Sequence, residues 1–250
     1  MYDFMNKSAL FQLFHGLERK GPGTEAATLA ALKRCSPLPP EPVVVDFGCG
    51  AGAATLTLAR ALNTKVIGVD VYAPFLEELQ ARAAAAGLTH KVETLLADFA
   101  NPARAPRSID LLWSEGAIFV LGWRQGLRLW APLVRPGGFL ALTEMTWLTD
   151  SPLEEARQAW SQWYPSMGAL ESNCRAALDL GLHIVDRFVL PAEAWQAFSG
   201  PLNRRCEELL RNPETDAGLI EEIRETEKEM ALYERHGTCY GYVFYILRAE

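Results

Sequence analysis

Short runs of consecutive apolar residues alternate with amphipathic segments through the first 147 residues of the chain. Five runs predict buried β-strands: VVVDF (43–47), KVIGVD (65–70), KVETLLAD (91–98), SIDLLWSE (108–115) and FLALTEMTW (139–147). The segments between them, among them AATLTLARAL (53–62) and APFLEELQARAAAAG (73–87), have helical periodicity. Strands that alternate with helices predict an α/β fold with a doubly wound, mostly parallel sheet, and continuous apolar runs indicate strands buried on both faces.

The pattern differs at both ends of this core. Residues 5–18 predict an amphipathic helix, and the sequence KGPGT at 20–24 ends it before a second helix capped by Thr24. After Trp147 the rhythm changes to longer excursions, with one charged amphipathic helix near 214–235 and a last strand, YGYVFYILRA. We therefore expect one domain over 1–250. It would contain an N-terminal lid helix (1–24), a core (25–147), and a region of helical cap excursions with the terminal strands (148–250).

The composition excludes several classes of function. The 250 residues are 49% apolar, enough to build a large core, and the net charge of −7 without any basic run argues against a nucleic-acid-binding surface. No apolar run reaches the roughly 18 residues that a membrane span needs, and the N-terminus lacks the features of a secretory signal. Five scattered cysteines without a Cys-x-x-Cys pair indicate reduced thiols in a cytoplasmic protein, and four separated histidines predict no metal site.

The segment DFGCGAG (46–52) carries the first chemical signal. Its spacing is Asp46-x-Gly48-x-Gly50-x-Gly52, and it also satisfies the dinucleotide fingerprint G-x-G-x-x-G/A. Glycines in such a turn let the backbone approach a ligand at a helix N-terminus, so they do not by themselves distinguish one nucleotide from another. A P-loop is excluded because no Gly-Lys-Ser/Thr follows.

Acidic residues discriminate better than the glycines. Asp46 lies inside the turn, where it would repel a diphosphate but suit a ligand with an ammonium group. Asp70 ends the second strand, 22 residues after Gly48, where an acid can accept from both ribose hydroxyls. Asp98 follows the third strand and could accept from an adenine amino group. Together these acids describe a cationic nucleoside that carries an amino acid, which is S-adenosylmethionine.

The chain is similar to the class I S-adenosylmethionine-dependent methyltransferases. The similarity rests on the segments VVVDFGCGAG, VIGVDVY, LLADF, IDLLWSEGAI and LVRPGGFLALTE, while RKGPGT, WSEGAI and YGYVFY resemble a bacterial group related to quinone-biosynthesis methyltransferases. The resemblance implies a seven-stranded sheet with one antiparallel strand. It also implies cofactor-binding residues: Asp46, Gly48, Gly50 and Gly52 at the methionyl end, Asp70 at the ribose, Val71, Tyr72, Asp98 and Phe99 near the adenine, and Ser114 and Glu115 under the sulfonium.

Three features leave alternatives open. Glu115 could bind the cofactor ammonium, hold a substrate cation or act as a general base, or it could only cap a turn. The aromatic residues Trp147, Trp160, Trp163 and Tyr164 could wall a substrate pocket or belong to the core. Similarly, GPG at 21–23 fits either a lid hinge or an ordinary loop.

The sequence thus predicts a cytoplasmic methyltransferase that uses S-adenosylmethionine to methylate a small-molecule acceptor, with Glu115 as the candidate catalytic residue. We expect no nucleic-acid or membrane partner, and a homodimer is compatible with the sequence. A non-catalytic sensor of the cofactor or its demethylated product is the main alternative. A nicotinamide-dependent oxidoreductase is less favoured, because Asp46 would face its diphosphate.

Overall fold

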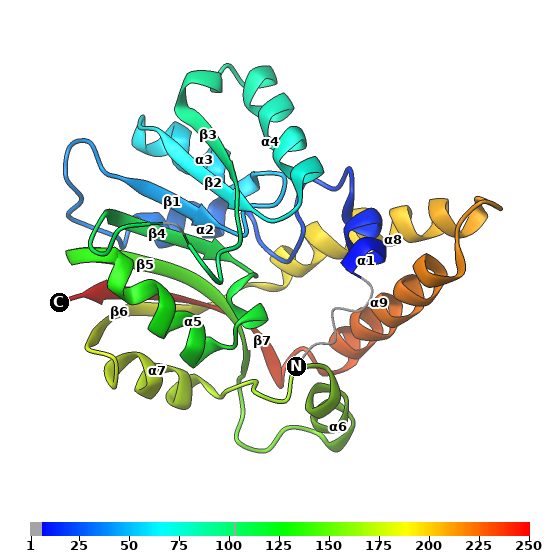
Figure 1. Ribbon diagram of the computed structural model, residues 1–250. Helices are drawn as coiled ribbons and strands as arrows, with labels where there is room; N and C mark the ends of the chain where they lie inside the picture. Colours follow the sequence, from blue (N-terminus) through cyan, green and yellow to red (C-terminus); the bar gives the residue numbers. More distant parts are fainter. Residues whose placement is uncertain (1–6, 103) are drawn as a thin grey trace.

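A single seven-stranded sheet organises the molecule (Figure 1). The computed structural model describes residues 7–102 and 104–250. The strand order is β3-β2-β1-β4-β5-β7-β6, and β7 runs antiparallel to both of its neighbours. The strands are β1 (Val44–Phe47), β2 (Val66–Asp70), β3 (Val92–Leu96), β4 (Ile109–Glu115), β5 (Val134–Trp147), β6 (Leu182–Val189) and β7 (Tyr240–Ala249). The predicted doubly wound, mostly parallel sheet is confirmed.

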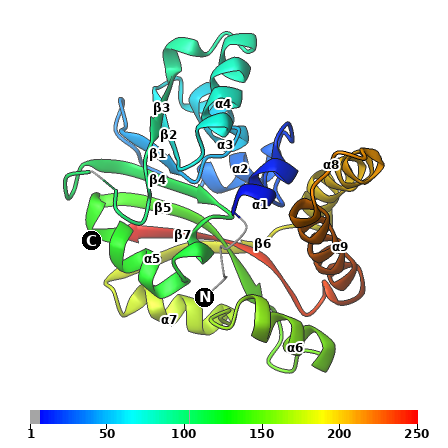
Figure 2. The ribbon, with the colours of Figure 1, turned by 45° about the vertical axis from the view of Figure 1, so that its right-hand side comes forward.

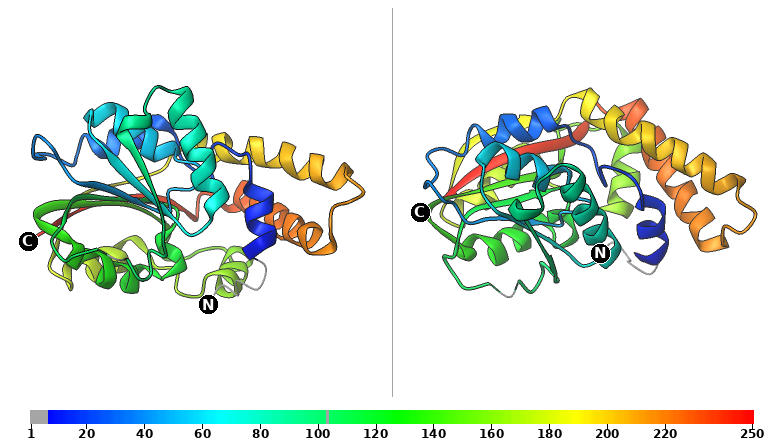
Figure 3. Two further views of the ribbon diagram at one scale, coloured as in Figure 1. Left: turned by 45° about the horizontal axis from the view of Figure 1, so that its top comes forward. Right: turned by 90° about the horizontal axis from the view of Figure 1, so that it is seen from above.

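Helices cover both faces of the sheet. On one face lie α2 (Glu25–Leu32), α3 (Ala53–Leu62) and α4 (Ala73–Ala85), and on the other lie α5 (Trp123–Trp130) and α7 (Leu170–Leu178) (Figure 3). Short 3₁₀ turns, η2 (Thr89–Lys91), η3 (Ile118–Val120) and η4 (Ala131–Leu133), join the strands and helices. Thr24 caps α2 as predicted, since its hydroxyl accepts from the Ala27 N–H. Apolar residues on both sides of the central strands are buried, which explains their continuous apolar sequences.

The remaining helices gather beyond the carboxyl ends of the parallel strands. These are α1 (Lys7–Phe14), α6 (Glu154–Trp163), α8 (Ala192–Arg211) and α9 (Ala217–His236), and Figure 2 shows them around the edge of the sheet nearest the glycine turn. The predicted amphipathic helices near 5–18 and 214–235 correspond to α1 and α9. The long α8 was not predicted, because Gly200-Pro201 reads as a helix break although the helix continues through Pro201.

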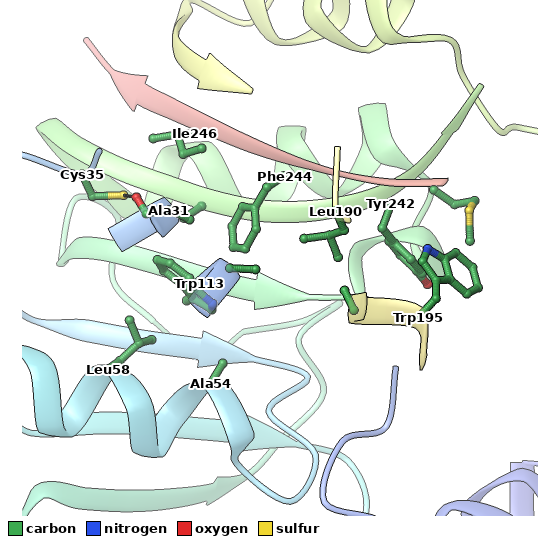
Figure 4. Close-up of a cluster of buried hydrophobic side chains, with 14 of the residues drawn as sticks. Ala31, Cys35, Ala54, Leu58, Trp113, Leu190, Trp195, Tyr242, Phe244 and Ile246 are labelled. Atoms are coloured by element: carbon green, nitrogen blue, oxygen red, sulfur yellow. Dashed lines mark hydrogen bonds between the residues drawn. The ribbon is translucent and has the colours of Figure 1, made fainter. Parts of the chain in front are cut away.

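One apolar cluster connects the sheet to this end of the molecule. It runs from Leu58 on α3 past Trp113 on β4 and Phe244 on β7 to Trp195 on α8 and Tyr242 on β7 (Figure 4). The glycine turn and the helices beyond the carboxyl ends of the strands (α1, α6, α8 and α9) therefore flank one continuous apolar cluster. Positions at the ends of β4 and β5 are held in a fixed register, with Glu115 opposite Thr143.

Candidate active site

The three predicted glycines of the turn after β1 all have left-handed backbones. Their φ angles are +69° at Gly48, +51° at Gly50 and +79° at Gly52. A Cβ atom at Gly48 would lie 2.3 Å from the Ala117 Cβ, and one at Gly52 would lie 2.0 Å from the Leu79 Cδ1. The turn therefore requires glycine both for its backbone and for its close packing.

Asp70 holds this turn against the end of β2. Its carboxylate accepts hydrogen bonds from the Gly50 N–H at 2.9 Å and the Tyr72 N–H at 3.0 Å. Burial raises the pKa of Asp70, and the backbone donors, with Lys20 nearby, oppose that rise. One carboxylate thus fixes both the glycine turn and the start of α4.

Asp46 lies beneath the turn and is 1% exposed. Its carboxylate accepts from the Thr55 hydroxyl at 2.6 Å. Burial raises the pKa of Asp46 to about 8, and the neighbouring carboxylates of Glu115 and Asp70 add to the rise. A cation placed beside Asp46 would therefore stabilise its ionised form.

Glu115 ends β4 and binds three donors. It accepts from the Trp113 indole N–H at 3.0 Å and the Thr28 hydroxyl at 2.6 Å, and it forms an ion pair with Arg19 at 3.0 Å. Sequence reasoning missed Arg19 and Thr28, which reach Glu115 across 96 and 87 residues of chain. Arg19 opens the segment RKGPGT, but neither its sequence nor that around Thr28 indicates a contact with Glu115, and only the fold brings them to the end of β4.

A cavity of about 80 Å³ lies between the turn, the end of β4 and the segment that follows α1. Its wall carries three acids, Glu18, Asp46 and Glu115, and two bases, Arg19 and Lys20. Free amino acids have one ammonium and one carboxylate, so this wall has the charges to bind both. The cavity lies at the turn that was predicted to hold the methionyl end of the cofactor.

The residues predicted for the adenosine end lie outside this cavity, and one of them, Tyr72, packs against the N-terminal segment. Phe11 of α1 stacks on Tyr72, with ring centroids 4.5 Å apart and planes inclined by 20°. The Lys20 stem lies against Gly50, and its ammonium donates to Glu78 at 2.7 Å and sits over the Phe75 ring. An adenosine at Asp70 and Tyr72 would meet these side chains.

The other predicted residues have varied surroundings. Val71 is 42% exposed beside Tyr72, and Asp98 is exposed two residues beyond the end of β3, where it accepts from the Ala100 N–H. Phe99 is buried, and its ring reaches to within 3.6 Å of the Cβ position at Gly48. Ser114 is fully buried and donates to the Phe47 carbonyl at 2.8 Å, so its hydroxyl ties β4 to β1. Their contacts with a cofactor stay predictions.

The described residues contain no group of three or more His, Cys, Asp or Glu side chains placed to hold a metal ion. In the same part of the chain, no helix has the length and hydropathy to cross a bilayer.

Comparison with known proteins agrees with this arrangement. The family model described as a methyltransferase domain matches residues 44–138. A dimethylglycine N-methyltransferase from Parasynechococcus marenigrum is 33% identical over 116 residues, which cover 46% of this chain and 41% of the relative. The chain thus spans less than half the length of that relative.

Two solved structures share the fold across the chain. A methyltransferase from Thiobacillus denitrificans, in complex with S-adenosyl-L-homocysteine, has a TM-score of 0.78 at 24% identity, covering 98% of both chains. A methyltransferase from Geobacter sulfurreducens with the same ligand has a TM-score of 0.79 at 22% identity, covering 100% of both. Residues 44–138 thus match a methyltransferase domain, and the chain as a whole has the fold of these two methyltransferases. The predicted relation to quinone-biosynthesis enzymes stays a prediction.

Proposed function

We propose that this protein transfers a methyl group from S-adenosylmethionine to a small-molecule acceptor. The observation that supports this most is the charge pattern of the cavity, which Asp46, Glu115 and Arg19 line at the glycine turn. A methionyl group carries the complementary ammonium and carboxylate. A nicotinamide dinucleotide would instead place a diphosphate beside Asp46, an unfavourable contact between like charges.

Each residue then has a binding or positioning role. S-adenosylmethionine supplies a methyl group already activated by positive sulfur. Asp46 and Glu115 would hold its ammonium, Arg19 its carboxylate, and Asp70 its ribose hydroxyls. The protein contributes orientation and exclusion of water, and pre-organised positioning lowers a barrier by roughly 7–11 kcal/mol. No covalent nucleophile is required.

Calorimetry with S-adenosylmethionine, S-adenosylhomocysteine and NAD tests the cofactor assignment. We expect the first two to bind and NAD not to bind. Tight NAD binding without S-adenosylmethionine binding would refute the methyltransferase proposal. Incubation of metabolite pools with cofactor labelled in its methyl group then separates an enzyme from a sensor, because a sensor binds both ligands but labels no acceptor.

Glu115 supports a narrower proposal within this function. Its three donors hold the carboxylate in one position at the cavity wall, which favours a role in placing the cofactor. Glu115→Gln removes the charge that Arg19 and the ammonium share, so cofactor affinity should fall. Normal affinity with turnover lowered roughly 10²–10⁴-fold would instead indicate a general base.

Residues 7–23 form the gate of the cofactor site in this proposal. Phe11 and Lys20 would leave Tyr72 and Gly50 when the adenosine enters, and the segment would then close over it as a lid. Hydrogen exchange should become slower between residues 7 and 23 when the cofactor is added. Unchanged exchange would make the segment ordinary scaffold. Cytoplasmic location and assembly into a homodimer stay predictions.

A further inference from the structure

A second cavity lies between the end of α1 and the middle of α8. It has a volume of about 240 Å³, and it shares no lining residue with the cavity at the glycine turn. Its lining residues are His15, Gly16 and Leu17, which follow α1, and Pro201, Arg204, Arg205 and Glu208, which belong to α8. The proposed cofactor contacts use none of these side chains, so the cavity needs an explanation of its own.

The lining of this second cavity is mainly basic. Arg204 is exposed and has no hydrogen bond or ion pair with any other described residue. The Arg205 guanidinium lies 4.0 Å from the Glu208 carboxylate, which is longer than a hydrogen bond. Among the described residues that line the cavity, Glu208 is the one acid, and its side chain is 66% exposed. Two guanidinium charges are therefore compensated by a single, loosely placed carboxylate.

Arg205 has an unsatisfied donor as well as an unpaired charge. Its Nε is buried and has no hydrogen-bond partner in the described part of the chain. Such atoms are costly and rare in native proteins. The Arg205 side chain is 31% exposed, so water compensates the guanidinium only in part. An anion beside the guanidinium would offset this cost, because charge-assisted hydrogen bonds to arginine are among the strongest that side chains form.

The opposite wall, at the end of α1, also suits an anion. The carboxyl end of a helix normally repels an anion, because its free carbonyl groups carry partial negative charge. Here the Lys20 ammonium donates to the Phe14 carbonyl at 2.7 Å and to the Leu17 carbonyl at 2.9 Å, which offsets that charge. His15 pairs through Nδ1 with Glu78, so its Nε2 has no partner among the described residues. This wall therefore does not cancel the positive charge of α8.

Apolar packing holds the two walls of the cavity together. Leu13 and Leu17 pack with Leu202 and Cys206 of α8 in a buried cluster of their own. Figure 3 shows α1 beside α8 and α9. Because Leu17 belongs to this cluster and also lines the cavity, the cavity lies at the edge of the cluster. A ligand bound there would contact both the end of α1 and α8.

We propose that this cavity binds the phosphate group of a small molecule, and that the bound phosphate ties α1 to α8. The inference goes beyond the proposed methyl transfer and does not depend on it. A phosphate group carries close to two negative charges at neutral pH and three strong acceptor oxygens, so it matches two guanidinium groups better than a carboxylate does. Residues 18–22, which come next in the chain, line the cavity at the glycine turn. The phosphate would therefore restrict the segment that gates the cofactor.

Three probes test the class of ligand: inorganic phosphate, glycerol 3-phosphate and acetate. Calorimetry measures their binding to the full chain at constant ionic strength and without cofactor. We expect both phosphates to bind at least about tenfold more tightly than acetate. Tighter binding of glycerol 3-phosphate would support a phosphorylated metabolite as the ligand, and tighter binding of inorganic phosphate would support the free ion. Equal affinity for all three probes would overturn the proposal.

Arg204→Gln and Arg205→Gln locate the site, with Arg211→Gln as the matched control. Each of the first two should weaken phosphate binding by about tenfold or more. Arg211 lies on the same helix, is 74% exposed and pairs with Glu207 outside the cavity, so its substitution removes the same charge. The control should change affinity by less than about twofold, because exposed charges at a distance are screened.

Two outcomes of these substitutions would overturn the site. Equal losses in all three variants would mean that phosphate responds only to net charge. Unchanged affinity in both Arg204→Gln and Arg205→Gln would mean that phosphate binds elsewhere, for example beside Lys20 at the glycine turn. Because Arg204 is exposed, its variant keeps the test decisive should Arg205→Gln fold poorly.

Hydrogen exchange tests whether the phosphate ties α1 to α8. Saturating phosphate, without cofactor, should slow exchange in α1 of the wild type but not of Arg204→Gln. Unchanged exchange in α1 of the wild type would overturn this part of the proposal. Titration of each variant with S-adenosylhomocysteine keeps the two proposals apart. Loss of phosphate binding with normal cofactor affinity leaves the proposed function intact, whereas a wild type that binds phosphate but not S-adenosylhomocysteine refutes only the proposed function.

Discussion

Two acidic residues on the neighbouring strands β4 and β5 differ in their hydrogen-bond partners. Glu115 closes β4 and is bound by a guanidinium, a hydroxyl and an indole N–H. Glu144 lies one position beyond the Thr143 that pairs with Glu115, and it has no hydrogen-bond partner among the described residues. The two side chains point to opposite faces of the sheet, because successive residues of a strand alternate.

The difference separates two ways of holding a buried acid. Around the glycine turn, Asp70 and Glu115 are held by the protein's own donors, so their positions are set before any ligand arrives. Glu144 is buried without a donor, so the folded chain favours its neutral, protonated form. The first arrangement favours precise placement of a ligand, whereas the second makes the stability of the fold depend on pH.

Substitution of Gly52 should give the largest effect. It tests how rigid the region around the glycine turn is, where Asp70 and Glu115 have hydrogen-bond partners (the paired region). Gly52→Ala would place a Cβ 2.0 Å from Leu79 at φ +79°, combining backbone strain with overpacking. We expect the free energy of unfolding to fall by about 3–5 kcal/mol in urea denaturation. The matched control is Gly87→Ala, at φ +68° with open space around its Cβ, which should lose about 1–2 kcal/mol. Equal losses would show that the turn tolerates repacking.

Asp70→Ala removes the acid that holds the turn and, in our proposal, the ribose. Cofactor affinity should fall about 100-fold, since charge-assisted hydrogen bonds contribute roughly 1.5–3 kcal/mol each. Asp150→Ala is the control, because Asp150 is an exposed acid that is not predicted to contact the cofactor. Its loss should be at least tenfold smaller by calorimetry. A normal dissociation constant for Asp70→Ala, with unchanged circular dichroism, would contradict the ribose assignment.

Glu144→Gln tests, through the free energy of unfolding, whether the buried Glu144 carboxyl lacks a partner. The folded pKa is about 8 and the ordinary value is 4.5, so between these values the folded protein keeps a proton that the unfolded chain has lost. Stability from this group is therefore complete below about pH 4.5 and is lost as pH rises towards 8. Asp46 contributes in the same direction, so only the difference between wild type and variant isolates Glu144.

At pH 8 the Glu144→Gln variant should exceed the wild type in free energy of unfolding by about 2 kcal/mol, and at pH 5 the gain should be smaller. Urea denaturation at both pH values measures this. A variant that is less stable at pH 8 would mean that Glu144 has a partner that supports the fold.

Local sequence signals predicted the region of the glycine turn much better than the surroundings of Glu144. The strands from β1 to β5, the glycine turn and Asp70 follow from apolar runs and turn spacing, because each depends on residues that are neighbours in the chain. Arg19 and Thr28 could not be found this way, since their contact with Glu115 crosses the fold. The sequence also could not predict that Glu144 lacks a hydrogen-bond partner, because this depends on every element packed around it. For the same reason, the sequence left open whether Trp160 and Tyr164 line a substrate pocket or belong to the core.

Phe11→Ala should give the smallest effect and tests whether the paired region must open. Phe11 stacks on Tyr72, where the adenine is expected, and the ring pair contributes roughly 0.5–1.5 kcal/mol. If this stack must break before the adenosine enters, its loss should tighten cofactor binding about 2–10-fold by calorimetry. Phe198→Ala is the control, because its ring packs edge-on against Phe14 of α1, with ring centroids 5.9 Å apart. Weaker binding in Phe11→Ala would instead mean that Phe11 covers the bound adenine, and the gate would then act only as a lid.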